Sequence, residues 1–217
     1  MSTKPADFFI GVIDFFAIIL PGALLSYLVL VALRQYHPPL ADLPGEGTAA
    51  GWVAFALSSY LLGHFASLIG AFFLDALYAL TYLKFRSRTW RRRPLWNRLD
   101  DQLYVRAGAL KEAELGTSNV TTYKWARMTL QSHAAGAMQE IDRLEADSKF
   151  FRSVTVVLVI VALAFGGSIT THLGSGWGSL LLAIFVYLCF WRFSNLRWKA
   201  TEAAYLAVIV LKLQPAK

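Results

Sequence analysis

One stretch of this chain, residues 49–83, is too long and too apolar to be an ordinary water-exposed helix. It runs for 35 residues, and its only acidic, basic or histidine side chains are His64 and Asp75. About 20 mostly apolar residues suffice to cross the roughly 30 Å hydrocarbon core of a bilayer. The stretch therefore predicts a transmembrane helix that tilts or that continues beyond the bilayer.

Three further stretches have the same character, and they comprise residues 8–33, 154–172 and 177–193. Hydrophobic residues make up 56% of the chain and charged residues 16%, whereas a soluble domain carries about 25% charged residues. This composition excludes a disordered chain or a disulfide-rich secreted scaffold, and the single cysteine, Cys189, cannot form an intrachain disulfide. We therefore expect four transmembrane helices in two hairpins.

The charged residues are concentrated between the second and third predicted spans. Residues 84–152 contain 14 basic and 8 acidic residues, and the other 148 positions contain 7 and 6. Lys and Arg gather on the cytoplasmic side of a membrane protein, and the loops 34–48 and 171–176 hold one such residue and none. We therefore expect a bacterial inner-membrane protein with both termini and the basic block in the cytoplasm.

The predicted fold is an all-α membrane protein with a helical cytoplasmic insert and a C-terminal amphipathic helix. Residues 1–83 form the first transmembrane hairpin, and residues 84–152 form the basic insert. Residues 153–194 form the second hairpin. Residues 195–217 form a cytoplasmic helix that returns along the inner interface or covers the insert.

Two helices are expected within the insert. Pro94 starts the first helix and Gly116 ends it. Thr117, Ser118 or Asn119 then caps the second helix. Because no proline follows before the third span, the chain from about residue 120 is expected to form one long helix or two nearly coaxial helices.

A candidate polar strip lies on the second span and comprises Tyr60, His64, Ser67 and Asp75. His64 and Asp75 are 11 residues apart, about three helical turns, so they share one face. Ionisable groups at membrane depth are costly, and they usually face a bundle interior or a watery cavity. The strip is interpreted either as the lining of an ion or proton path, or as a structural set with Asp75 at the inner interface and His64 packed between helices.

Small residues on the same span are candidates for helix packing, and they are Gly63, Gly70 and Ala71. Small side chains let helix backbones approach closely in lipid, where burial of apolar surface gives no driving force. The second span is therefore expected to be the central packing helix.

A basic run follows the second span and includes Arg86, Arg88, Arg91, Arg92 and Arg93. A cluster of this kind just inside the membrane is expected to contact anionic lipid headgroups. A cytoplasmic protein is the second candidate partner. Tryptophans interleave with the arginines, as they do in nucleic-acid binders, so nucleic acid is the third and least favoured partner.

No constellation of catalytic residues is found. The sequence contains none of the common nucleotide-binding loops, zinc-ligand motifs or serine-nucleophile motifs. We therefore expect no catalytic residue, no cofactor and no metal site. The spacing of Arg127 and His133 resembles the Arg and His pattern of HEPN ribonucleases, in which such residues converge at a dimer interface.

The order of the segments is an apolar pair, 8–33 and 49–83, then the insert 84–152, then an apolar pair within 154–193. This layout resembles small multi-pass bacterial inner-membrane proteins of anti-phage defence systems, and the resemblance implies a protein that senses a partner or is triggered by one. The leading hypothesis is a homo-oligomer that forms a pore or scaffolds a cytoplasmic partner. The alternatives are an ion channel or transporter that uses the His64 and Asp75 face, and, last, a membrane-bound enzyme.

Overall fold

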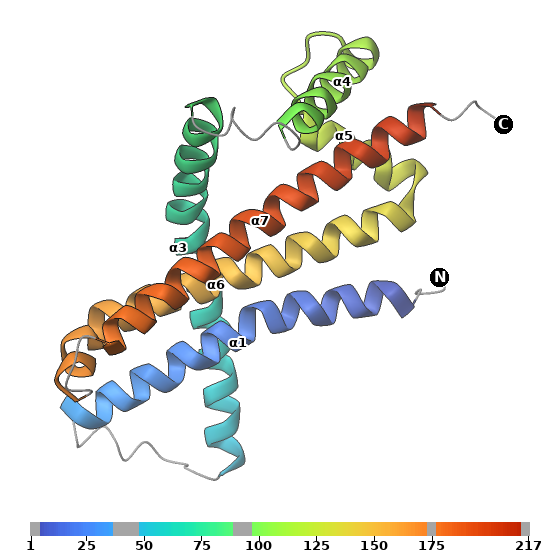
Figure 1. Ribbon diagram of the computed structural model, residues 1–217. Coiled ribbons are helices and arrows are strands. Elements are labelled where there is room, and N and C mark those ends of the chain that lie inside the picture. Colours follow the sequence, from blue (N-terminus) through green and yellow to red (C-terminus); the bar gives the residue numbers. More distant parts are fainter. Residues whose placement is uncertain (1–4, 37–47, 89–96, 173–176, 214–217) are drawn as a thin grey trace. The chain divides into compact units, whose positions relative to one another are not determined.

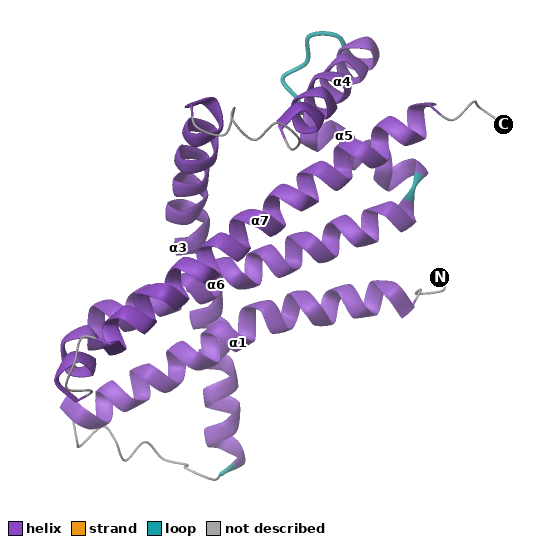
Figure 2. Cartoon of the chain, in the orientation of Figure 1, coloured by secondary structure: helices purple, strands orange, loops and turns teal. Residues whose placement is uncertain are grey.

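The computed structural model describes residues 5–36, 48–88, 97–172 and 177–213. Apart from short turns these residues are helical, and none of them lies in a strand (Figures 1 and 2). The helices are α1 (Pro5–Tyr36), α3 (Ala49–Arg88), α4 (Asn97–Leu115), α5 (Thr122–His133), α6 (Ala135–His172) and α7 (Trp177–Leu213). Over the described residues the chain is all-α, as the sequence predicts.

Three of the described helices are long and apolar enough to cross a membrane. The candidate segments are Ala17–Arg34 in α1, Ala49–Leu80 in α3 and Trp177–Leu213, which is all of α7. The first two overlap the first and second predicted spans, and the third contains the fourth predicted span, 177–193, and continues to Leu213. Helix α6 is not among the three, so the fourth crossing, residues 154–172, stays a prediction.

The chain divides into two compact units, each assembled from segments far apart in the sequence. Unit 1 consists of Met1–Ile10, Leu77–Glu145 and Ser194–Lys217. Unit 2 consists of Gly11–Ala76 and Ala146–Phe193. Helices α6 and α7 therefore contribute residues to both units.

Unit 2 contains a crossing of α1 and α3 at which the two backbones touch. A Cβ atom added to Gly22 would lie 1.7 Å from the backbone oxygen of Ser59, and one added to Gly63 would lie 2.1 Å from that of Ile18. Next to the crossing, Ser59 Oγ lies 3.3 Å from the Oγ of the buried Ser26. Because no side chain fits between the helices, glycine is required at both positions.

The apolar cluster that the described residues form in unit 2 is small, and much of the described apolar surface points outward. Leu25 of α1, Ala66 of α3, and Val156 and Val157 of α6 form the buried cluster. Helix α3 exposes many large apolar side chains, among them Trp52, Leu61, Phe65, Leu68, Phe72 and Phe73. An apolar surface of this extent marks a membrane or protein interaction surface.

Unit 1 has a larger core, built from four helices. Its buried residues come from α4, α5, the start of α6 and the end of α7, and they are Ala107, Trp125, Ala126, Leu130, Met138, Ile141, Ala204, Tyr205, Val208 and Ile209. The C-terminal part of the chain thus packs on helices of the insert. This is one of the two arrangements that the sequence analysis allowed.

The C-terminal residues do not form a separate helix, because α7 is continuous from Trp177 to Leu213. The predicted break fell at the change from apolar to charged residues near Arg192. That change ends the apolar stretch, but Arg, Lys and Glu are good helix formers. No glycine or proline follows between Gly178 and Pro215, so nothing in this sequence interrupts the helix.

The prediction of one long helix, or two coaxial helices, after residue 120 is wrong. Helix α5 ends before Ala134, whose φ of −145° and ψ of 61° depart from helical geometry. Arg127 Nη1 lies 2.9 Å from Glu145 Oε2, whereas 18 residues of straight helix would separate two residues by about 27 Å. Helices α5 and α6 therefore fold back on each other as a hairpin.

The end of α4 is as predicted, and the start of α5 is not. Gly116 has a φ of +60° and its N–H donates to Glu112 O at 2.9 Å, which is the glycine stop expected there. The cap of α5 is Thr121, whose Oγ1 accepts from the N–H of Lys124 at 3.3 Å. Residues 117–119 serve instead in the turn that follows Gly116, where the Ser118 N–H donates to the Gly116 oxygen at 2.9 Å.

Candidate functional site

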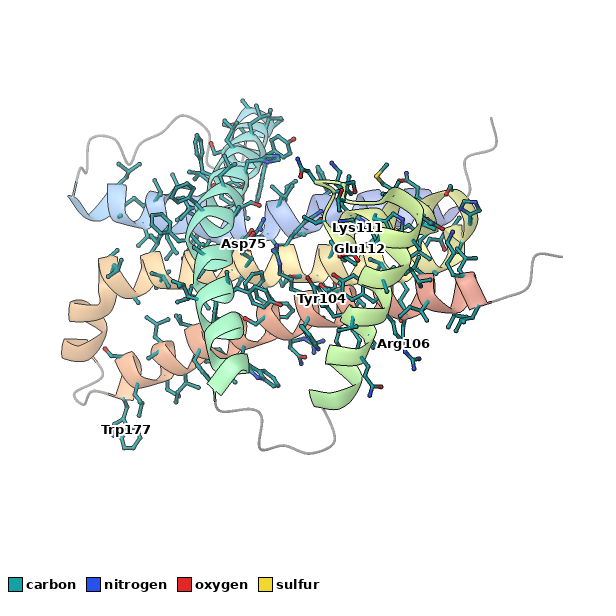
Figure 3. All side chains as sticks on the ribbon, turned by 90° about the horizontal axis from the view of Figure 1, so that it is seen from above. Asp75, Tyr104, Arg106, Lys111, Glu112 and Trp177 are labelled. Atoms are coloured by element: carbon teal, nitrogen blue, oxygen red, sulfur yellow. The ribbon has the colours of Figure 1, made fainter. Side chains whose placement is uncertain are left out.

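Arg152 of α6 binds two polar residues of α3 inside unit 2. Its Nη1 donates to Asp75 Oδ2 at 3.3 Å and lies 3.5 Å from Oδ1, and its Nη2 donates to Ser67 Oγ at 3.3 Å. The Arg152 side chain is 12% exposed and that of Asp75, labelled in Figure 3, is 28% exposed. The guanidinium thus compensates the carboxylate charge at a largely buried position.

Gly70 makes room for this contact. A Cβ atom on Gly70 would lie 2.8 Å from Arg152 Cγ and 3.3 Å from Val156 Cγ2. The aliphatic part of Arg152 therefore lies against the backbone of α3 between Ser67 and Asp75. The Arg152 Nε atom is buried, and it meets no hydrogen-bond partner among the residues that the structure describes.

The remaining two residues of the predicted strip form a separate pair. The rings of Tyr60 and His64 meet edge to face, with centroids 4.5 Å apart and planes at 80°. Tyr60 is 41% exposed. The structure therefore brings Ser67 and Asp75 together through Arg152, and the contacts of the described residues do not join Tyr60 and His64 to them.

Arg152 is not among the site residues that the sequence predicts, where it is the last residue of the basic block. A signal was present, because Arg152 stands two residues before the apolar stretch of α6 and Asp75 is the one acidic residue of the predicted second span. Charged groups at membrane depth usually pair with one another. Helical periodicity alone does not say which two helices carry the pair.

The predicted small-residue row contacts two different helices. Gly63 lies against Ile18 of α1, and Gly70 lies against Arg152 and Val156 of α6. Ala71 is half-buried. Within unit 2, helix α3 therefore contacts α1 and α6 through positions that carry no side chain.

The predicted basic run is described only in part. Arg86 and Arg88 belong to the last turns of α3. Arg91, Arg92 and Arg93 lie outside the described residues. Their partner, whether lipid headgroup, protein or nucleic acid, stays a prediction.

A second polar cluster closes the α5 and α6 hairpin of unit 1. Arg127 Nη2 lies 2.7 Å from Asp142 Oδ1, and its Nη1 lies 2.9 Å from Glu145 Oε2. The hydroxyl of Tyr123 donates to Glu145 Oε1. Burial, and then this hydrogen bond to a carboxylate, raise the pKa of Tyr123 above its usual range.

A third cluster joins three helices of unit 1. Glu114 at the end of α4 accepts from Lys212 Nζ of α7, and from Trp125 Nε1 of α5 at 3.1 Å. The hydrogen bond from Lys212 lowers the pKa of Glu114, burial opposes that shift, and the bond from Trp125 adds to it. The cluster ties the C-terminal end of α7 to the insert.

Arg127 and His133 contact different partners among the described residues. The Arg127 guanidinium is bound by Asp142 and Glu145, whereas His133 Nδ1 lies near Ser132 Oγ at 2.6 Å and the Thr129 oxygen at 3.1 Å. Across the described ranges no group of three or more His, Cys, Asp or Glu residues is arranged to hold a metal ion. The chemistry of the three clusters is charge compensation between helices.

Comparison of the chain with protein-family models, with curated proteins and with solved structures finds no match.

Proposed function

We propose that this chain is a non-enzymatic, homo-oligomeric, multi-pass protein of a bacterial inner membrane, and that it scaffolds a cytoplasmic protein partner. In this proposal unit 2 is embedded in the bilayer, and unit 1 is the helical module that meets the partner. Both termini lie in the cytoplasm.

The proposal rests chiefly on the core of unit 1. This core is made of large apolar side chains such as Trp125 and Leu130, as in a water-soluble bundle. Two of its four helices, α6 and α7, also supply residues of unit 2, which exposes the large apolar surface. In this proposal unit 1 is held at the bilayer because α6 and α7 continue from the membrane into its core.

The packing of α6 supports its assignment as the fourth membrane span. Val156 and Val157 of α6 are buried against Leu25 of α1 and Ala66 of α3, both of which lie in candidate spans. Residues 154–163 hold no charged side chain. A helix segment that shares a core with two membrane spans belongs at the same depth.

The contact between Asp75 and Arg152 favours a scaffold over a channel on this face of α3. A carboxylate that lines an ion path faces water, whereas Asp75 is bound by a guanidinium from a neighbouring helix. Purified protein in liposomes tests this directly. If the protein is a scaffold, liposomes that contain it should show the same ion flux as empty liposomes. If it is a channel, the flux should be higher, and Asp75→Asn should change it.

Site-specific photo-crosslinking in cells tests the partner. Arg106 and Glu112 are exposed on α4, and Trp177 is exposed at the start of α7 (Figure 3). A crosslinker at position 106 or 112 should yield one recurrent protein adduct, and one at position 177 should not. Equal adduct patterns at all three positions would contradict a cytoplasmic scaffold.

Cysteine labelling in intact cells tests the orientation, in a chain from which Cys189 has been removed. A cysteine at position 39 or 174 should react with a membrane-impermeant reagent, and one at Gly116 should not. The reverse pattern would place the basic block outside.

The layout adds anti-phage defence as the proposed biological setting. This setting predicts that phage form fewer plaques on cells that carry the chain.

A further inference from the structure

The end of α7 exposes an apolar stripe within unit 1. Leu206, Val210 and Leu213 are 44%, 49% and 74% exposed. Spacings of four and three residues place them on one face of the helix. On the other side of α7, Ala204 and Val208 are fully buried in the core of unit 1. The three exposed residues are called the α7 stripe below.

Charge is sparse along the α7 stripe, and the nearest acidic residue on its face is Glu202, one helical turn before Leu206. Ala203 and Ala207 flank it and are partly buried against the unit 1 core. Lys212 is the one charged residue between positions 203 and 213, and it binds Glu114. Helices that lie on a membrane surface carry Lys and Arg on their polar face, so these borders do not favour a helix that lies in the headgroup region.

The α7 stripe is also too small to recruit a freely diffusing protein. A stable complex in solution buries roughly 800 Å² on each partner, and three partly exposed side chains contribute far less. Two chains anchored in one membrane, by contrast, meet at a high effective concentration, so a smaller contact suffices. The size of the stripe therefore favours a partner that is already held in the same bilayer.

We propose that the α7 stripe packs against the same stripe of a second copy of this chain, about a two-fold axis. An uncharged apolar stripe meets its own copy without like-charge repulsion, as an isologous contact requires. Two copies inserted in the same orientation present parallel α7 helices, so Val210 meets Val210. The inference rests on the proposed membrane anchoring, and it names the surface through which the oligomer forms.

Disulfide crosslinking in native membranes tests the contact. Val210→Cys, in a chain that also carries Cys189→Ser, should give a covalent dimer on mild oxidation. Parallel helices in contact bring the paired Cα atoms within the reach of about 4.4–6.8 Å that a disulfide needs. The matched control is Met128→Cys on α5, where the residue is 59% exposed in the same unit. The control should stay monomeric.

A charge substitution provides the second measurement. Val210→Glu replaces an exposed side chain, so unit 1 should keep its helical circular dichroism signal. The dimer dissociation constant in liposomes should rise by about tenfold or more, because a carboxylate pair would be buried in the contact. Met128→Glu should leave the constant unchanged.

Carbonate extraction of the same membranes separates the two proposals. If the chain is extracted, membrane anchoring fails and this inference fails with it. If the chain is retained but Val210→Cys crosslinks no better than Met128→Cys, the proposed function stands and the inference is overturned. Labelling of Val210→Cys by bilayer-soluble reagents alone would also overturn it, because lipid would then cover the stripe.

Discussion

The two units of this chain hold their helices together by different means. In unit 2, helices α1 and α3 meet where Gly22 and Gly63 bring one backbone against the other, and among its described residues the fully buried side chains are mostly small, with Phe193 as the large exception. In unit 1, bulky side chains such as Trp125 and Leu130 fill the core. Unit 1 also has charged clusters around Arg127 and Glu114.

This difference follows from the solvent that each unit is proposed to face. In water, burial of apolar side chains drives helices together. In lipid the surroundings are as apolar as leucine, so helices associate through close packing and polar contacts. The packing of a helical unit therefore carries information about its surroundings, and four sets of substitutions test this interpretation.

The largest effect is expected at the backbone crossing of unit 2. Gly63→Leu would place a side chain where a Cβ already lies 2.1 Å from the Ile18 oxygen. We expect a loss of about 3 kcal/mol or more of unfolding free energy, because the backbones must separate. Thermal unfolding in detergent measures it.

Gly108 of α4 is the control for this substitution. No atom lies within 4 Å of a Cβ added there, so Gly108→Ala should stabilise the protein by about 0.5–1 kcal/mol through helix propensity. Equal destabilisation by both substitutions would show that the crossing is not special.

The next effect is expected in the core of unit 1. Leu130 is fully buried, and Leu130→Ala should cost about 2–5 kcal/mol of unfolding free energy, as in water-soluble cores. Leu68 of unit 2 is 65% exposed, and Leu68→Ala should change stability in detergent by less than about 0.5 kcal/mol. Chemical unfolding followed by circular dichroism measures both. Similar losses at the two positions would break the comparison.

The polar contact of unit 2 should contribute more to stability than the polar contact of unit 1. Asp75→Asn leaves Arg152 without its carboxylate, and we expect a loss of about 2 kcal/mol, less than the roughly 3–5 kcal/mol of a fully buried pair. Arg127→Gln in unit 1 should cost about 1 kcal/mol or less, because the Arg127 side chain is 36% exposed.

Two controls separate a charge effect from a loss of shape at these positions. Exchange of the charges by Asp75→Arg with Arg152→Asp should restore most of the loss if the pair is what matters. Added salt should weaken the Arg127 contribution and leave that of Asp75 largely unchanged. If added salt also weakened the contribution of Asp75 to stability, this would show that water reaches the pair.

The smallest effect concerns the pH dependence of unit 1. Because folding lowers the pKa of Glu114, its stabilising contribution is complete above the ordinary glutamate pKa of about 4.3. The contribution is lost as the pH falls through the lowered, folded-state pKa. Glu114→Gln should therefore cost up to about 1 kcal/mol at neutral pH, since the pair with Lys212 is partly exposed.

Unfolding of wild type and Glu114→Gln across pH values measures this difference. The two stabilities should converge as the pH falls through the lowered pKa of Glu114. A difference that persists in acid would show that the effect does not arise from the charge of Glu114.

Much of the helix layout can be predicted from the sequence, because it depends on residues that are close together in the chain. The apolar stretch 49–83 predicts most of α3, and Gly116 predicts the end of α4 at Leu115. The polar residues near Arg192 predict the end of the apolar stretch but not the end of α7. Helix propensity and membrane preference are different properties, and charged residues at that point oppose only the second.

By itself the sequence determined the all-α class, the long apolar helices and the glycine stop after α4, since each depends on residues a few positions apart. Tertiary structure decided that Arg152 binds Asp75, that Gly22 and Gly63 meet, and that α5 turns back on α6. Helical periodicity says which side chains share a face, but which other helix meets that face depends on the packing of distant segments against one another.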